Sequence, residues 1–156
     1  MNKGMSLIEI LVVVAVFAIL GVIVTQAVTL TLRGSKKSES QVRVRENLSY
    51  ALSVMERQLR NANLITICDT GLRVEYKDSK DYPTSFSCET DYVASGSARL
   101  TSDEIRVTAC SISCPGYQTS SNPPYIDIFL SGEEASVTGV EGASVSAQTK
   151  VYLRTY

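Results

Sequence analysis

The stretch Lys3–Val24, KGMSLIEILVVVAVFAILGVIV, decides how this chain is organised. Seventeen of the eighteen residues from Leu7 to Val24 are uncharged and nearly all apolar, and the exception is Glu9. A helix of eighteen residues is about 27 Å long, close to the ~30 Å hydrocarbon thickness of a membrane. A carboxylate in such a helix costs on the order of 2.5–3.5 kcal/mol at mid-membrane and less near the interface. Glu9 is therefore either an acid that reaches the interface or one that awaits a buried cation from another chain.

Composition narrows the class of protein. The 156 residues are enough for one membrane segment and one domain of ordinary size. The chain has 15 basic and 16 acidic residues, so its net charge of −1 gives no strong argument for nucleic-acid binding. It has no histidine, and we find no G-x-S-x-G, phosphate-loop or Rossmann glycine pattern. We therefore predict that the protein is not an enzyme.

The four cysteines, Cys68, Cys88, Cys110 and Cys114, all follow the apolar segment. An even number in an exported domain favours two disulfides over free thiols, and the spacing does not match a zinc site of paired C-x2-C motifs. Four cysteines allow three pairings. We expect Cys68–Cys88 and Cys110–Cys114, because both loops are short and local.

The residues Gly4-Met5-Ser6-Leu7-Ile8-Glu9, followed by an apolar run, resemble the class III signal of type IV pilins and type II secretion pseudopilins. The resemblance implies that prepilin peptidase cuts between Gly4 and Met5 and that Met5 is then N-methylated. It also implies that Glu9 attracts the α-ammonium of Met5 on an adjacent subunit. An unpaired carboxylate in a low-dielectric bundle is penalised until a cation arrives, so the pairing would drive assembly.

A second helical pattern continues the chain to Ala62. Apolar residues recur at spacings of three and four, and they are Val44, Leu48, Ala51, Met55, Leu59 and Ala62. Glu39–Arg43 and Glu56–Arg60 are expected ion pairs at i,i+4 on the polar side. The segment ALSVMERQLRNANLI (51–65) resembles the end of the long helix in J-type pseudopilins and W-type minor pilins.

Beyond this helix the apolar period changes to two. Strands are predicted over 64–68, 72–77, 104–110, 125–130 and 150–156, with a weaker one over 136–140. Turn-rich segments separate them at 77–83, 95–97, 115–124 and 131–134. The fold class is α+β, a long N-terminal helix packed on an antiparallel sheet, similar to the lollipop shape of pilins. We expect a leader at 1–4, a membrane or filament-core helix at 5–32, an amphipathic helix at 33–63, and an extracytoplasmic sheet domain at 64–156.

Two charged groups have alternative interpretations. The acidic pairs Asp78/Asp81, Asp103/Glu104 and Glu133/Glu134 invite a calcium site, but none matches an EF-hand, and solvated loops explain them better. The basic group Arg33, Lys36, Lys37, Arg43 and Arg45 suits lipid headgroups or packing between subunits, and less well the phosphates of DNA. Its charge alone would place the C-terminal domain in the cytoplasm, whereas the cysteines favour an extracytoplasmic one.

Two functions therefore stand. The first is a structural subunit of a pilus, a type II secretion or a competence-type filament, most similar to a minor pilin or pseudopilin, which would prime assembly at the tip. Its partners would be other pilin subunits, prepilin peptidase, the inner-membrane assembly platform, and membrane lipid before assembly. The second is a bitopic membrane protein with an extracytoplasmic binding or adhesion domain that does not polymerise. A variant of the first is a major structural pilin that forms the fibre shaft.

Overall fold

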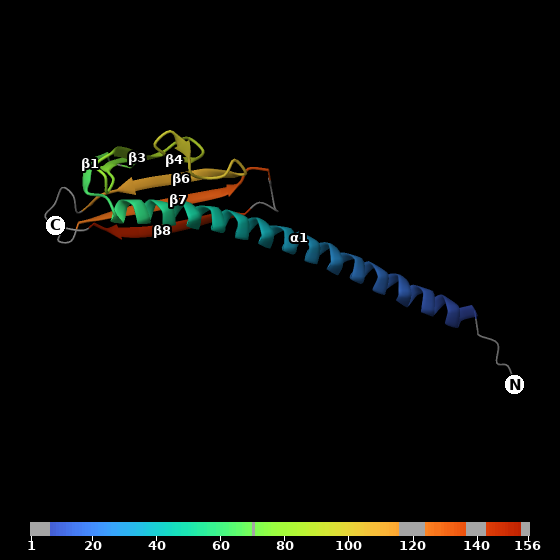
Figure 1. The fold of residues 1–156 in the computed structure, drawn as a ribbon. Helices are drawn as coiled ribbons and strands as arrows, with labels where there is room; N and C mark the ends of the chain where they lie inside the picture. The colour runs from blue at the N-terminus through green and yellow to red at the C-terminus, as the bar shows by residue number, and fades with distance from the viewer. Residues whose placement is uncertain (1–6, 70, 116–123, 137–142, 154–156) are drawn as a thin grey trace. The chain divides into compact units, whose positions relative to one another are not determined.

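The computed structural model of the chain describes residues 7–69, 71–115, 124–136 and 143–153. Its longest element is the helix α1, Leu7–Arg60, which runs unbroken for 54 residues (Figure 1). The chain divides into two compact units, Met1–Ser38 and Glu39–Tyr156, and α1 contributes to both. The second unit, here called the head unit, contains every strand.

Within the head unit, one stripe of α1 is buried. The predicted residues Val44, Leu48, Ala51, Met55 and Leu59 are all 0% exposed. Ala62, just beyond the helix, is partly buried against the same core. The ion pairs Glu39–Arg43, at 2.7 Å, and Glu56–Arg60 also form as expected on the opposite, exposed side. The period of three and four residues in the sequence therefore located the packed face of the helix correctly.

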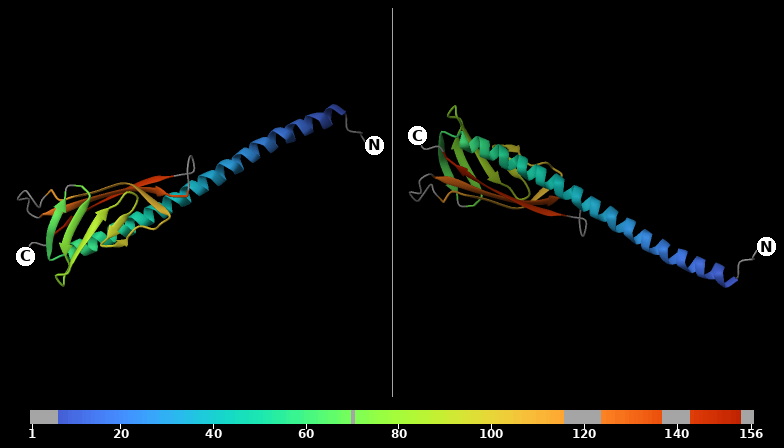
Figure 2. Two further views of the ribbon diagram at one scale, coloured as in Figure 1. Left: turned by 90° about the horizontal axis from the view of Figure 1, so that it is seen from above. Right: turned by 90° about the horizontal axis from the view of Figure 1, so that it is seen from below.

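The strands form two antiparallel sheets, where a single sheet was expected (Figure 2). Sheet A is a meander in the order β1-β2-β3-β4-β5, and sheet B has the order β6-β7-β8. The strands of sheet A are β1 Leu64–Asp69, β2 Arg73–Lys77, β3 Pro83–Cys88, β4 Val93–Ser95 and β5 Ala98–Arg99. Those of sheet B are β6 Ile105–Ser113, β7 Tyr125–Glu134 and β8 Ser144–Tyr152.

One hydrophobic core joins the helix stripe to both sheets. Sheet A contributes Val74 and Phe86, and sheet B contributes Ile112, Ile128 and Leu130, each with no exposed surface. Alternate residues of β7 are buried along its whole length, which is the pattern of a strand with one solvated face. The backbone also crosses between the sheets, where the Ile112 N–H donates to the Gly71 carbonyl at 3.0 Å. The head unit is thus a helix packed on two sheets that share one core.

The five strong strand predictions each fall on an observed strand, but their bounds differ. The turn expected at 131–134 is instead the end of β7, which pairs there with β6 and β8 through Gly132. The weak strand expected over 136–140 lies almost wholly outside the described residues, and Ser136 itself is in a turn. β3, β4 and β5 were not predicted, because the hydroxyl-rich sequence of β3, PTSFSC, carries only Phe86 as a large apolar residue.

All four cysteines are paired, but not as predicted. The disulfides are Cys68–Cys114 and Cys88–Cys110, with Cα separations of 6.3 and 5.8 Å. Cys88–Cys110 links β3 of sheet A to β6 of sheet B, and Cys68–Cys114 links β1 of sheet A to the residue that follows β6. The prediction of two disulfides is therefore confirmed, and the predicted pairing Cys68–Cys88 with Cys110–Cys114 is wrong.

Strand geometry explains why the local pairing fails. β1 and β3 both pair with β2, so Cys68 and Cys88 are two strand spacings apart, about 10 Å. Cys110 and Cys114 are four residues apart along an extended chain, about 13 Å. Both separations exceed the reach of a disulfide, which ends near 7 Å between Cα atoms. The cysteines can pair only across the two sheets.

Candidate functional site

The predicted processing and assembly residues lie at the N-terminal end of the chain. Gly4 and Met5 are outside the described residues. Glu9 lies in the first described turn of α1 and is exposed. An acid suits this position in part because the N-terminal end of a helix carries a partial positive charge. The Glu9 carboxylate has no hydrogen bond or ion pair to any of the residues that the structure describes.

The helix around Glu9 presents apolar side chains on all sides. The large apolar side chains from Leu7 to Leu32 are between 46% and 77% exposed. By its length and composition α1 can cross a membrane, and none of its most apolar eighteen-residue window is buried within the chain. A surface apolar all round requires a surrounding of lipid or of other apolar helices.

Hydroxyl groups in the same helix are bonded to its own backbone. The side-chain oxygens of Thr25, Thr29 and Thr31 donate to the carbonyls four residues earlier, at 2.8–2.9 Å. This bonding satisfies the hydroxyl protons without any outside partner, which is what a helix needs in an apolar surrounding.

The predicted basic group follows the apolar segment along α1. Arg33, Lys36, Lys37, Arg43 and Arg45 are all exposed. The Arg43 guanidinium is paired with Glu39, while the other four make no ion pair within the part of the chain that the structure describes. These cations are therefore available to lipid headgroups or to acids of a neighbouring subunit.

One member of each acidic pair considered for calcium makes a contact within the head unit. Asp78 Oδ1 accepts the backbone N–H groups of Lys80 and Tyr82, which closes the β2–β3 turn. Asp103 pairs with Arg99 at 2.8 Å, and Glu133 pairs with Arg106 across the β6–β7 ladder. Among the described residues, no three acidic or cysteine side chains gather into a group that could hold a metal ion.

Two contacts between α1 and the rest of the head unit were missed from the sequence, one to β2 and one to the β5–β6 connection. The Asn47 side-chain oxygen accepts the Ser102 backbone N–H at 3.0 Å, and Gln58 Oε1 accepts the Tyr76 hydroxyl at 2.6 Å. Both join residues 18 or more positions apart, so no local pattern signals them.

Comparison with known proteins identifies the N-terminal segment. Residues 1–25 match the model of the prokaryotic N-terminal methylation motif. No curated protein matches the chain, and no solved structure does. The match covers Gly4, Met5, Glu9 and most of the apolar run.

The methylation motif, the exposed apolar helix and the sheets packed on its C-terminal half agree with one another. Proteins with this motif are made as precursors that prepilin peptidase processes, and they are structural rather than enzymatic. Residues 1–25 therefore carry the class III signal of the pilin-like family, on a chain with pilin-like α+β architecture.

Proposed function

We propose that this protein is a non-enzymatic filament subunit, a minor pilin or pseudopilin, of a type IV pilus, a type II secretion system or a competence-type machine. The precursor is held in the cytoplasmic membrane with the head unit outside the cytoplasm, cut between Gly4 and Met5, and N-methylated at Met5. It then joins the growing filament through residues 5–32 and primes assembly at the tip. Its partners are other pilin subunits, prepilin peptidase, the inner-membrane assembly platform and, before assembly, membrane lipid.

The observation that carries this proposal is the methylation motif over residues 1–25, together with an apolar segment of α1 that no described residue of the chain buries. A plain membrane anchor needs the apolar length but does not need the carboxylate of Glu9 within it. A filament subunit needs both, because cleavage creates an α-ammonium that neutralises the carboxylate of a neighbour.

Mass spectrometry of the mature protein tests the processing step. We expect a chain that begins at N-methylated Met5. An intact chain beginning at Met1, extracted by detergent as a monomer, would refute the proposal and favour a bitopic binding or adhesion protein.

A pair of variants tests the assembly contact. Glu9→Ala should leave the protein in the membrane and processed, but absent from sheared filaments, because the carboxylate that attracts the neighbouring ammonium is gone. Ile10→Ala is the matched control, since it shortens an exposed apolar neighbour on the same turn without changing charge. Equal incorporation of both variants would rule out a pairing role for Glu9.

A further inference from the structure

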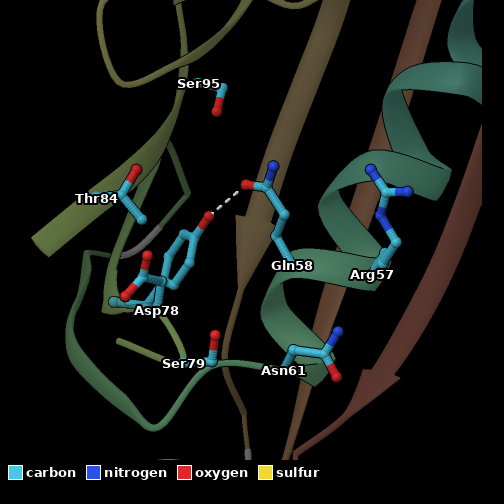
Figure 3. A pocket seen from close by; sticks show the side chains of 8 residues that line it. Arg57, Gln58, Asn61, Asp78, Ser79, Thr84 and Ser95 are labelled. Carbon is cyan, nitrogen blue, oxygen red and sulfur yellow. Dashed lines mark hydrogen bonds between the residues drawn. The ribbon is translucent and has the colours of Figure 1, made fainter. Parts of the chain in front are cut away.

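A hollow of about 430 Å³ opens on the head unit between the last turns of α1 and the strands β2, β3 and β4 (Figure 3). Its volume lies within the range of about 300–1,000 Å³ that is typical of small-molecule sites. Its lining residues all belong to the head unit and include none of Gly4, Met5 and Glu9, so its role does not depend on the proposed function.

The base of the hollow is a fixed pair of polar groups. The Tyr76 side chain is 1% exposed and its ring stacks on Phe86, with 5.5 Å between centroids. Its hydroxyl donates to Gln58 Oε1, which leaves the Gln58 amide N–H groups free to donate elsewhere. Burial raises the pKa of Tyr76 to about 12, so the hydroxyl stays a neutral donor at any physiological pH.

Two opposite charges line the hollow without forming an ion pair with each other. Arg57, on α1, is exposed and makes no ion pair with any residue that the structure describes. Asp78 uses Oδ1 for the β2–β3 turn and keeps Oδ2 for another partner. In Figure 3 the two side chains lie on opposite sides of Gln58. A ligand in the hollow would meet a strong donor on one side and a strong acceptor on the other.

Hydroxyl groups complete the lining. Ser79, Thr84 and Ser95 come from the β2–β3 turn, β3 and β4. The hydroxyls of Ser79 and Ser95 make no hydrogen bond to any residue that the structure describes. Each hydroxyl can both donate and accept.

We propose that this hollow binds a neutral hexose or N-acetylhexosamine residue of a saccharide. Sugar hydroxyls donate and accept at once, so they match a lining that mixes a pure donor, a pure acceptor and dual groups. Arg57 and Asp78 together leave the lining without a net charge, so it offers no overall attraction to a ligand with a net charge of either sign. The net neutral lining therefore favours a neutral polyhydroxylated ligand over either ion.

Binding at one such site is weak. The Tyr76 ring is buried under its own neighbours, so it offers no open aromatic face on which a sugar could stack. We expect a Kd in the region of 1 mM for a single residue. Several copies close together, on one surface, would raise the apparent affinity through multivalency.

The test uses the full chain in micelles of lauryldimethylamine oxide, whose headgroup carries no sugar. The protein is applied to an array of neutral, sialylated and sulfated glycans, and Kd values for methyl glucoside, methyl galactoside and methyl N-acetylglucosaminide are measured by NMR titration. We expect binding to neutral glycans and to at least one of the three glycosides. Binding confined to sialylated or sulfated glycans, or no binding at all, would overturn the proposal.

Matched variants test whether the glycoside binds in the hollow. Arg57→Ala and Thr84→Val should each weaken binding about tenfold or more, because each leaves sugar hydroxyls without a partner. Arg60→Ala and Thr108→Val are the controls, since Arg60 is one turn away and paired with Glu56, and Thr108 lies on β6. The valine change keeps the branched shape of Thr84, and near-wild-type circular dichroism would show that a variant is folded. Equal loss in variants and controls, or no loss in either folded variant, would refute the site.

Discussion

One double cysteine variant should distinguish the observed disulfide pairing from the local pairing. The two pairings predict losses in its free energy of unfolding that differ by about 5 kcal/mol. The variant Cys110→Ala/Cys114→Ala deletes one cysteine from each observed disulfide, so it opens both loops. Under a local pairing, the same variant would open only a four-residue loop. The two connectivities therefore predict very different losses of stability from one change.

The magnitudes follow from the loop lengths. The inner disulfide, Cys88–Cys110, closes a loop of 22 residues, and in the chain-entropy model it contributes about 3.4 kcal/mol. The outer one, Cys68–Cys114, spans 46 residues, but the inner bond shortens its effective loop to about 25 residues, worth about 3.5 kcal/mol. Opening both should cost about 7 kcal/mol, whereas opening a four-residue loop would cost only about 2 kcal/mol.

The control variant is Cys88→Ala/Cys110→Ala, which removes only the inner disulfide and should cost about 3.4 kcal/mol. Unfolding is measured by urea titration of the full chain in micelles, with free thiols alkylated. The signal is tyrosine fluorescence, because the chain has eight tyrosines and no tryptophan. If Cys110→Ala/Cys114→Ala is the less destabilising of the two variants, the connectivity across the sheets is wrong.

Three further changes test the packing of the head unit in the same urea assay. Leu48→Ala should lower the free energy of unfolding by about 2–5 kcal/mol, because the Leu48 side chain is 0% exposed in the core. Leu64→Ala is the control, and it should cost less than about 0.5 kcal/mol because Leu64 is 52% exposed. Equal losses would contradict the described core. Gly132→Ala should lower the free energy of unfolding by about 1–3 kcal/mol, because the new Cβ would lie 3.1 Å from the Arg106 carbonyl oxygen and 3.5 Å from Leu48. An unchanged stability would show that β6 or α1 moves aside. Tyr76, whose pKa burial raises to about 12, stays protonated in the native state while the unfolded side chain ionises near pH 10. The contribution of protonated Tyr76 to stability is therefore intact below about pH 10, and the free energy of unfolding should fall by about 1.4 kcal/mol per pH unit from there towards pH 12. Tyr76→Phe should lack this fall. Parallel pH profiles of the two proteins would contradict the reasoning.

The features that the sequence predicted are those with a local period. The stripe from Val44 to Leu59 repeats at the helical spacing, and β7 alternates cleanly, so short windows contain the signal. β3 has only Phe86 as a large apolar residue, and its position is set by pairing with β2 rather than by its own pattern.

Arrangement between distant segments was not predictable in the same way. The disulfides depend on which strands lie opposite one another across the two sheets, and Cys68 and Cys114 are 46 residues apart. The hollow joins Gln58 on α1 to Tyr76 on β2 and Ser95 on β4, and no spacing in the chain marks these residues as neighbours. The N-terminal signal was predictable for the opposite reason, since it is read as a contiguous segment.

The threonine hydroxyls that bond back to their own helix make α1 indifferent to the nature of its apolar surroundings. Thr25, Thr29 and Thr31 need no outside acceptor for their protons, whether lipid tails or neighbouring helices surround them. Lipid tails are as apolar as leucine side chains, so exchange of one for the other yields little hydrophobic free energy. If the chain is a filament subunit as proposed, the helix would pass between a bilayer and a bundle at small cost, and close packing and the carboxylate of Glu9 would set the direction of that exchange.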